Sequence, residues 1–486
     1  MDGAVYAQPL YLPNISISGK GAHNVLFVAT ANDSVYAFDA DSNTGSNSTP
    51  LWQVSMIDAA HGAASGARVV GSSDVACGDI SPIYGITGTP VIDLNSGTIY
   101  LVANSIESGA NIYRLHALDI TTGAEKAGSP VVISGSVTGT GDGSVGGKVA
   151  FNPTTQMNRA ALLLTAGNLY IGFGSHCDVA PFHGWLFSYN ATTLVRNNVF
   201  MTTPNGGLGG IWMSGSGPAT DGNGNIYLAT GNGTFDTSNV PATELGDSIL
   251  KLSASNLALL DYFTPYNQAT MEGGDIDLGS GGVLLLPNQN GSNPHLIMQG
   301  GKTGSLYLMN RDQLTSQNSH YCSTACNNTD PEILQEVQNT NPGMWSSLGY
   351  WNNFIYVWGA GEGTSVDRLK AYSLTNGVLG TTPASTSNNT FSFPGATPVI
   401  SSNGTSNGIV WAIDNSNNGT DGSSFGAAVL HAYDATNVSH ELYNSTQASN
   451  NRDQAGNSVK FTVPLVINSK VYVGTSTEVD VYAPLP

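Results

Sequence analysis

The sequence predicts an all-β protein, and more narrowly a single eight-bladed β-propeller built from four-stranded antiparallel blades. Two observations carry this prediction. One pattern occurs eight times: an apolar run that ends in small residues, followed by a second apolar run that closes on Asp or a similar polar residue. The runs are short, rich in Val, Ile, Tyr and Phe, and bounded by Gly, Asn, Asp and Ser, whereas no stretch keeps the 3.6-residue period of a surface helix.

Both runs of each repeat predict strands. The first runs are 24–30, 97–103, 167–173, 224–230, 294–300, 353–359, 408–413 and 470–475. The second runs are 35–39, 115–119, 185–190, 249–253, 306–310, 369–373, 430–434 and 479–483. Consecutive strands joined by short polar turns are expected to pair antiparallel.

A third segment precedes each pair and is expected to be the innermost strand of its blade. These segments are 8–11, 88–92, 160–164, 217–220, 282–286, 348–351, 396–400 and 463–467. Gly and Pro recur in them. Such residues suit strands near the ring axis, where the backbones of neighbouring blades approach each other closely.

The spacing of the repeats favours a propeller over other β-folds. The second runs close roughly every 50 to 80 residues, a period that suits four-stranded blades with loops of variable length. A pair of β-sandwiches is the alternative, but sandwiches rarely repeat one pattern eight times. If two repeats merge, the ring has seven blades.

The ends of the chain are expected to meet. The last repeat ends at Pro486, after its third predicted strand. We therefore expect residues 1–486 to form one domain whose ring is closed by its N- and C-terminal strands. In this arrangement residues 1–6 supply the outermost strand of the last blade, because such pairing removes an exposed strand edge.

The composition is acidic and poor in charge. The chain has 15 Lys and Arg against 34 Asp and Glu, a net charge of −19 and no basic cluster. These features argue against nucleic acid or an anionic membrane as a partner. No apolar run reaches the roughly 18 residues that a membrane-spanning helix needs.

A secreted, periplasmic or other extracellular location is expected. Only 10% of the residues are charged, and Gly, Ser, Thr and Asn fill the connections. The chain begins almost directly at a predicted strand, which predicts that a signal peptide has been removed. Asn-x-Ser/Thr sequons near predicted turns are potential glycosylation sites, and the polar surface would suit self-assembly in a dense layer.

Four cysteines allow three disulfide pairings. Cys322 and Cys326 are close enough in sequence to close their own loop, although with His320 the spacing also suits half of a metal site. Cys77 and Cys177 lie in different repeats, in loops that can reach the same end of the ring. We predict a bridge between them, formed in an oxidising compartment.

Several repeats resemble the tryptophan-docking repeats of pyrroloquinoline-quinone (PQQ) propellers. The segment Ser34-Val-Tyr-Ala-Phe-Asp-Ala-Asp41, followed by Thr44-Gly45 and Leu51-Trp52, carries this resemblance, and 115–123 and 430–436 are similar. The segments 77–90 and 209–215 resemble secreted bacterial PQQ-like repeat proteins that are common in soil acidobacteria. The resemblance covers nearly the whole chain and implies the fold. It implies less about activity, because PQQ-like repeats also build scaffolds that bind no quinone, such as the outer-membrane assembly lipoprotein of the β-barrel machinery.

The resemblance also implies a site for PQQ and calcium. Dehydrogenases of this type need a metal ion, a carboxylate base, a flat aromatic floor and a basic group at the quinone oxygens. By this resemblance Trp212 is the floor, Lys302 the basic group, and Asp275 or Asp277 the base or a metal ligand. Plainer roles stay open: Trp212 as packing between blades, Lys302 as a surface charge, and the two Asp as turn caps.

His176, Asp178 and His183 form the densest group of polar ligands in the sequence. They lie within eight residues of one another and can hold zinc or copper or act in acid–base chemistry. No spacing among them is diagnostic. The alternative is that each His hydrogen-bonds the backbone of a neighbouring blade.

Two functions of different class follow. The first is a secreted, non-catalytic propeller whose loop face binds a protein, a glycan, a polymer or a small molecule as a binding or surface-assembly scaffold. The alternative is a PQQ- and calcium-dependent oxidoreductase that acts on alcohols or sugars. The sequence favours the scaffold, because it has neither the vicinal Cys-Cys pair usual in quinone-type alcohol dehydrogenases nor a haem-attachment Cys-x-x-Cys-His motif.

Overall fold

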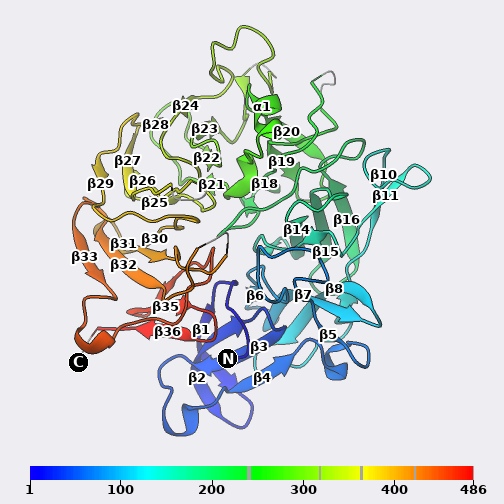
Figure 1. The fold of residues 1–486 in the computed structure, drawn as a ribbon, viewed down its shortest axis with the longest axis vertical. Helices are drawn as coiled ribbons and strands as arrows, with labels where there is room; N and C mark the ends of the chain where they lie inside the picture. Colours follow the sequence, from blue (N-terminus) through cyan, green and yellow to red (C-terminus); the bar gives the residue numbers. More distant parts are fainter. Residues whose placement is uncertain (238–241, 317–318, 362–364, 421–422, 485–486) are drawn as a thin grey trace.

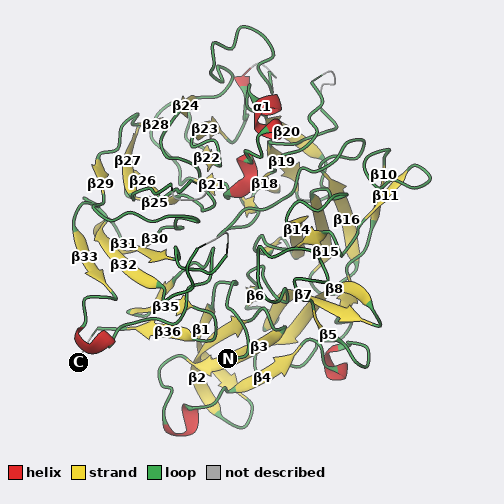
Figure 2. Cartoon of the chain, viewed as in Figure 1, coloured by secondary structure: helices red, strands yellow, loops and turns green. Residues whose placement is uncertain are grey.

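The computed structural model describes residues 1–237, 242–316, 319–361, 365–420 and 423–484. Small antiparallel sheets stand around a common axis, and the first and last sheets lie side by side (Figure 1). Strands account for nearly all of the regular structure, and the helical segments are single turns (Figure 2). The described residues therefore form an all-β, eight-bladed propeller, as the sequence predicts.

Blades 1 to 4 each contain four strands in chain order, with an added short strand in blades 2 and 3. Blade 1 is β1 (Leu10–Ile17), β2 (Gly21–Ala29), β3 (Ser34–Asp39) and β4 (Trp52–Ser55). Blade 2 is β6 (Val91–Asp93), β7 (Thr98–Glu107), β8 (Ala110–Asp119) and β9 (Val131–Val132), with β5 (Arg68–Val69) on the end of β7. Blade 3 is β13 (Leu163–Thr165), β14 (Asn168–Ser175), β15 (Trp185–Asn190) and β16 (Arg196–Met201), with β12 (Gln156–Met157) on the end of β14. Blade 4 is β17 (Ala219–Thr220), β18 (Asn225–Ala229), β19 (Ile249–Ser253) and β20 (Leu259–Phe263).

Blades 5 to 7 repeat the arrangement, and blade 8 has three strands. Blade 5 is β21 (Leu284–Leu285), β22 (Leu296–Gly300), β23 (Leu306–Asn310) and β24 (Gln335–Val337). Blade 6 is β25 (Gly349–Trp351), β26 (Phe354–Val357) and β27 (Lys370–Thr375), with β28 (Val378–Leu379) and β29 (Ser385–Thr386) both on β27. Blade 7 is β30 (Val399–Asn403), β31 (Ser406–Asp414), β32 (Val429–Asp434) and β33 (Glu441–Asn444). Blade 8 is β34 (Leu465–Ile467), β35 (Lys470–Gly474) and β36 (Val479–Tyr482).

Outside the blades lie a hairpin and a few helical turns. The hairpin is β10 (Ser136–Thr138) with β11 (Lys148–Ala150), and the one α-helical turn described is α1 (Gln268–Gly273). Short 3₁₀ turns occupy Gly45–Asn47, Ala59–His61, Leu278–Ser280 and Ser449–Asn451. None of the described helices has the length and apolar character needed to cross a bilayer.

Neighbouring blades are held together by shared apolar clusters and by one recurring hydrogen bond. The largest cluster joins side chains of blades 3, 4 and 5, including Tyr170, Leu228 and Ile297. The Tyr170 hydroxyl, on the second strand of blade 3, donates to the Ala254 carbonyl at the end of the third strand of blade 4, at 2.7 Å. A buried Tyr needs such a partner for its hydroxyl.

The same tyrosine bond recurs at the place where the ring closes. The Tyr472 hydroxyl of blade 8 donates to the Ala40 carbonyl of blade 1 at 3.1 Å. The N-terminal segment adds backbone contacts: Val5 N donates to Thr475 O at 3.1 Å, and the Met1 ammonium donates to Thr477 O at 2.6 Å. Residues 1–6 are not among the described strands, so their contribution differs from the outermost strand that the sequence predicts for them.

The close approach of the innermost strands confirms the expectation drawn from their Gly residues. A Cβ at Gly217, just before β17, would lie 2.4 Å from the Ala161 carbonyl oxygen of the preceding blade. A Cβ at Gly88 would lie 2.8 Å from the Ala160 carbonyl oxygen. Real Cβ atoms do not come this close, so only Gly allows these backbones to pack around the axis.

Candidate functional site: a cleft on the ring axis

A cleft of about 1150 Å³ opens where loops from seven blades meet. Its charged and aromatic lining residues are Asp79, Arg159, Asp178, Trp212, Asp275, Asp277, Lys302, Trp345, Phe393 and Phe461. Because these residues come from loops before, within and after blades 2 to 8, the cleft lies on the axis of the ring. Four of them, Trp212, Asp275, Asp277 and Lys302, are the residues that the sequence resemblance selects for cofactor chemistry.

Lys302 joins two carboxylates on one side of the cleft. Its Nζ lies 2.8 Å from Asp277 Oδ2 and 3.1 Å from Asp275 Oδ2. The side chains of Lys302 and Asp277 are only 12% and 11% exposed, whereas Asp275 is 60% exposed. Burial disfavours the ammonium form, but the charges of Asp277 and Asp275 outweigh it and hold the pKa of Lys302 above its usual value. A single cation therefore stands between two carboxylates.

The backbone around Asp277 is arranged to hold its side chain in place. Asn232 N donates to Asp277 Oδ1 at 2.8 Å. A Cβ at Gly231 would lie 2.1 Å from the same oxygen, so this position requires Gly. Behind it, the fully buried Asp247 accepts a bond from Leu278 N at 3.1 Å. Burial first, and then the charge of Asp277, raise the pKa of Asp247 well above its usual value.

Asp178 adds a carboxylate that titrates near neutral pH. Its backbone N–H donates to Ser175 Oγ at 3.0 Å, and the Ser175 hydroxyl donates to Asp178 Oδ1 at 3.1 Å. The side chain opens onto the cleft. Desolvation by the cleft walls, together with the charges of Asp277 and Asp275, raises the pKa of Asp178 to about 6. We call Asp178, Asp275, Asp277 and Lys302 the acidic wall.

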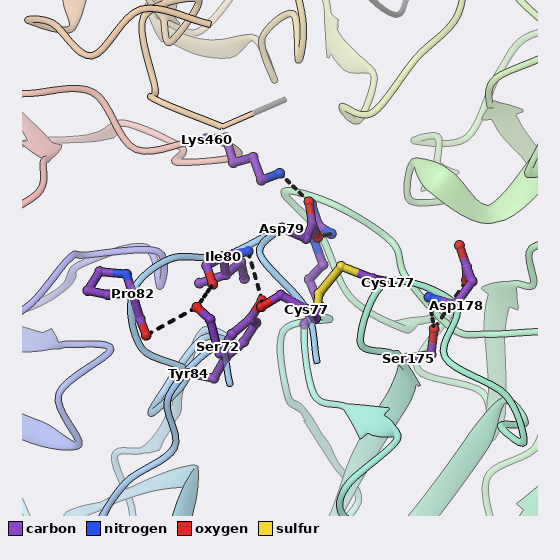
Figure 3. Close-up of a disulfide and its surroundings, with 11 residues drawn as sticks. Ser72, Cys77, Asp79, Ile80, Pro82, Tyr84, Ser175, Cys177, Asp178 and Lys460 are labelled. Carbon is purple, nitrogen blue, oxygen red and sulfur yellow. Dashed lines mark hydrogen bonds and ion pairs between the residues drawn. A yellow bond between two sulfur atoms is a disulfide. The ribbon is translucent and has the colours of Figure 1, made fainter. Parts of the chain in front are cut away.

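Asp79 and Arg159 also line the cleft, and together with the buried Lys460 behind them they form a second charged group, which we call the basic wall. The Lys460 ammonium, whose side chain is fully buried, is ion-paired with Asp79 (Figure 3). Arg159 Nη1 lies 3.6 Å from Asp79 Oδ2. Burial opposes ionisation of Asp79, but the charges of Arg159 and Lys460 outweigh it and hold the pKa of Asp79 below its usual value. The Arg159 guanidinium also lies 3.5 Å from the centre of the Phe461 ring, a cation–π contact.

A disulfide connects the two walls. Cys77 and Cys177 are bonded, as the sequence predicts, and Cys177 lines the cleft directly before Asp178. Cys77 lies two residues before Asp79, so the loop from Ser72 to Tyr84 is joined to blade 3 by the disulfide and to the loop before blade 8 by Lys460 (Figure 3). The Tyr84 hydroxyl braces this loop by donating to Cys77 O at 2.9 Å.

The second predicted disulfide, Cys322–Cys326, is also present and lies in the loop between β23 and β24 of blade 5. It closes only its own short loop. Disulfides are typical of proteins outside the cytoplasm, where thiols are not kept reduced. The two bridges therefore fit a non-cytoplasmic protein.

Aromatic side chains complete the walls of the cleft. The Trp212 indole lies against bare backbone: a Cβ at Gly174 would be 2.7 Å from its ring, and a Cβ at Gly210 would be 2.8 Å from its Nε1. Lys302 Nζ lies 5.7 Å from the centre of the Trp345 ring. The Trp345 ring packs edge-to-face with the Phe393 ring. Flat rings of this kind can stack on a planar ligand or on the apolar face of a sugar.

His176 and His183 are both buried but make different contacts. His183 is buried, with Nδ1 2.9 Å from Thr203 Oγ1 and Nε2 2.9 Å from the Asp142 carbonyl oxygen. His176 is buried against the edge of the Tyr84 ring, and burial lowers its pKa to about 4. No group of three His, Cys, Asp or Glu suited to a metal ion is found in the part of the chain that the structure describes. The metal role of His176, Asp178 and His183 stays a prediction.

Sequence reasoning missed much of this cleft. It did not single out Asp79, Arg159 or Lys460, nor the rings of Trp345, Phe393 and Phe461. Asp79 had a usable signal, because it lies two residues from Cys77, whose loop was expected to reach the same end of the ring as that of Cys177. Arg159 and Lys460 are 301 positions apart in the sequence, and no local pattern around either residue pairs it with Asp79.

The sequence matches no protein-family model and no curated protein. Solved structures with a similar fold are numerous. The quinohemoprotein alcohol dehydrogenase ADHIIG from Pseudomonas putida HK5 has a TM-score of 0.52 and 14% identity, over 97% of this chain and 71% of that chain. BamB from Moraxella catarrhalis has a TM-score of 0.50 and 10% identity, over 98% of both chains.

A europium-containing methanol dehydrogenase is similar to the same degree, with a TM-score of 0.50 and 13% identity over 96% of this chain and 84% of that chain. At such identities a structural likeness describes the fold alone, and the same fold carries dehydrogenases as well as BamB. The chain has a quinoprotein-like β-propeller fold.

Proposed function

We propose that the axial cleft binds a planar aromatic cofactor that carries carboxylates, together with a metal ion, and that the protein is a PQQ-dependent oxidoreductase acting on alcohols or sugars. One observation carries this proposal. Trp212, Asp275, Asp277 and Lys302 were selected for this chemistry from their sequence context, and they come from separate segments of the chain yet line one cleft. A fold that used these residues for packing or turn capping alone would have no reason to gather them there.

The residues of the cleft fit the chemistry of PQQ and a cation. The acidic wall offers three carboxylates, the ligand type that calcium prefers, beside the one ammonium of Lys302, but the described residues contain no preformed group of three His, Cys, Asp or Glu suited to a metal ion. The basic wall offers the Arg159 guanidinium, the group best suited to a carboxylate. Trp212 lines the same cleft and offers a flat surface for stacking. When bound, PQQ would supply the hydride-accepting quinone and the cation would polarise its carbonyl.

The chain's own groups then have separate tasks. Lys302, held charged by Asp277 and Asp275, donates hydrogen bonds to both carboxylates and holds them in place at the cleft. Asp178, with a pKa of about 6, is ionised at neutral pH and can accept the proton of a substrate hydroxyl. Trp212, Trp345 and Phe461 exclude water from part of the cleft. The disulfide fixes the two walls relative to each other.

A second candidate is a non-catalytic scaffold that binds a protein, a glycan or a polymer at this loop face. It is favoured by the position of Lys302, whose Nζ lies within 3.1 Å of both carboxylates and so already neutralises part of the charge that a metal ion would need. The absence of a vicinal Cys-Cys pair and of a haem-attachment motif in the sequence points the same way. BamB from Moraxella catarrhalis has a similar fold.

A titration separates the two candidates. The purified protein is titrated with PQQ in the presence of Ca²⁺ or La³⁺ while tryptophan fluorescence is followed, and the complex is then assayed for dye reduction with a panel of alcohols and aldoses. We expect stoichiometric quenching and turnover. Binding without turnover would support a ligand-binding scaffold, and the lack of any saturable binding would contradict the oxidoreductase.

A pair of tryptophan variants makes the titration specific to the cleft. Trp212→Ala removes the stacking surface and should weaken PQQ binding at least tenfold. Trp411→Phe is the matched control, because Trp411 bonds Ser401 in blade 7 and lies outside the lining of the cleft. Equal binding by both variants would remove Trp212 from the site.

We also propose that the protein is secreted to the periplasm or the cell exterior. The two disulfides support export. Fractionation of the source cells, with thiol alkylation before and after reduction, tests both points at once. With the same protein, mass spectrometry tests glycosylation of the sequons, and sedimentation tests self-assembly.

A further inference from the structure

Three aromatic side chains that line the axial cleft form a continuous row. The ring centres of Trp345 and Phe393 are 5.1 Å apart, and those of Phe393 and Phe461 are 6.1 Å apart. The row begins beside the acidic wall, where Lys302 Nζ lies 5.7 Å from the centre of the Trp345 ring. It ends at the basic wall, where the Arg159 guanidinium packs on Phe461. We call Trp345, Phe393 and Phe461 the aromatic row.

The rings of this row offer separate apolar patches and not one flat surface. Trp345 and Phe393 meet at an interplanar angle of 79°, and Phe393 and Phe461 meet at 88°. A fused planar ligand stacks along its whole length on a single platform, which rings at right angles do not provide. Successive units of a glycan chain instead each present a small face of C–H groups to a separate ring. The row therefore favours a carbohydrate over a planar aromatic ligand in this part of the cleft.

Uncharged polar groups lie beside the aromatic row. The cleft is also lined by Ser392, from the segment between β29 and β30, and by Ser416, Asn417 and Ser424, from the loop between β31 and β32. Ser392 N donates to Ser416 Oγ at 3.0 Å, which joins the two segments. Among the residues that the structure describes, the Asn417 amide, the Ser424 hydroxyl and the Trp345 indole N–H have no hydrogen-bond partner. These groups can donate to and accept from the hydroxyls of a sugar.

The volume and charge of the cleft narrow the ligand further. The cleft holds about 1150 Å³, which exceeds the roughly 300 to 1000 Å³ of a pocket for one small ligand. A cofactor at Trp212 would therefore leave room for a second molecule. The ammonium groups of Lys302 and Lys460 are each paired with carboxylates, and the chain carries a net charge of −19. Both features disfavour a polyanionic glycan.

We propose that the aromatic row, together with Ser392, Ser416, Asn417 and Ser424, is a binding subsite for a neutral oligosaccharide, one end of which lies at Trp345 beside the acidic wall. Binding at this subsite stands on the cleft alone. That the bound sugar is also the molecule acted on rests on the proposed function, and it narrows the substrate from alcohols or sugars to sugars.

Calorimetric titration of the full chain without PQQ tests the subsite. The probes are neutral mono-, di- and trisaccharides of glucose, galactose, mannose and xylose, with 1-butanol and trigalacturonic acid for comparison. We expect saturable one-to-one binding of a neutral sugar at millimolar concentration or below. Affinity should rise about tenfold from the monosaccharide to the trisaccharide, because each further unit reaches another ring. No binding of 1-butanol is expected.

Two asparagine variants tie the binding to the subsite. Asn417→Ala removes an exposed amide and should weaken sugar binding about fivefold, the effect of one hydrogen bond. Asn223→Ala is the matched control, because Asn223 is also exposed but lies in the turn between β17 and β18, outside the lining of the cleft. Its substitution should leave sugar binding unchanged. Trp345→Ala should remove most of the gain with chain length, and the asparagine pair decides if that variant does not fold.

The results overturn the subsite in three cases. These are no saturable binding of any neutral sugar, equal binding by Asn417→Ala and Asn223→Ala, and tighter binding of 1-butanol or trigalacturonic acid than of the neutral sugars. The subsite and the proposed function fail separately. Sugar binding by a chain that does not bind PQQ contradicts the oxidoreductase and supports the subsite, whereas turnover of simple alcohols without sugar binding overturns the subsite and supports the oxidoreductase.

Discussion

The two walls of the axial cleft hold similar groups in different ways. On the acidic wall three carboxylates face one ammonium, and Asp178 and Asp275 are open to solvent. On the basic wall a single carboxylate, Asp79, is held by two cations, and the Lys460 side chain is fully buried. The acidic wall can therefore change its charge near neutral pH, whereas the basic wall keeps its ion pairs.

This difference indicates that the two walls have different roles in the cleft. A wall that titrates and is partly exposed is suited to exchanging protons or cations with a ligand. A buried wall of paired charges is suited to holding one geometry, because breaking a buried pair leaves an unpaired charge. The Cys77–Cys177 bridge fastens one wall to the other, so it is the natural first place to separate their roles.

The largest effect is expected from removing that bridge. Replacing Cys77 and Cys177 by Ser releases a cross-link that spans 100 residues, and a loop of that length is worth roughly 4 to 5 kcal/mol of unfolding free energy. Replacing Cys322 and Cys326 opens a bridge across a separation of 4, which by the same relation costs about 2 kcal/mol. Chemical denaturation of both double variants measures the difference. Equal losses would show that the axial bridge does not hold the walls together.

The next largest effect is expected from Lys302→Met. Asp277 is 11% exposed and would be left without its cation, which costs about 3 kcal/mol for a buried pair. Lys470→Met is the control, because its partner Asp41 is 49% exposed and an exposed pair contributes less than about 1 kcal/mol. The measurement is again the denaturation midpoint. A loss for Lys302→Met no larger than that of the control would contradict the buried ion pair.

Acidification should affect the acidic wall alone. The pKa of Asp178 is raised to about 6, so this group is ionised above pH 6 and becomes protonated as the pH falls through that value. For a pKa near 6, the ionised fraction at pH 5 is roughly one tenth of that at pH 7, so affinity for a probe cation should fall about tenfold. Terbium luminescence titrations at the two pH values measure this. Asp178→Asn should remove most of the pH dependence, and an unchanged dependence in that variant would assign it to another group.

The smallest effect is expected from Asp275→Asn. Its side chain is 60% exposed, and Lys302 keeps its closer contact with Asp277, so the stability should change by less than about 0.5 kcal/mol. Asp277→Asn should cost more, because Asp277 is buried and also accepts from Asn232 N. Comparing the two variants by denaturation shows whether Lys302 depends on the buried carboxylate. A larger loss for Asp275→Asn would reverse the roles that the geometry indicates.

Local patterns predicted the blades and both disulfides well. The predicted strands 167–173 and 185–190 of blade 3 correspond to β14 (Asn168–Ser175) and β15 (Trp185–Asn190), because alternating apolar residues and the Gly and Asn turns act locally. Gly217 was correctly interpreted as a point of close approach to the axis. The role expected for residues 1–6 was not seen, because a segment's pairing partner depends on edges that lie far away in sequence.

The sequence by itself determined the class, the repeat and the candidate residues Trp212, Asp275, Asp277 and Lys302, because strand pattern, turn chemistry and motif context are all encoded over a few residues. Only the tertiary structure decided that these residues share one cleft with Asp79, which is paired with Lys460 at a sequence separation of 381. It also decided which carboxylates are buried, and burial and neighbouring charge set the pKa of Asp178 and Asp247. Both quantities depend on what the folded ring brings into contact, and no local pattern contains that information.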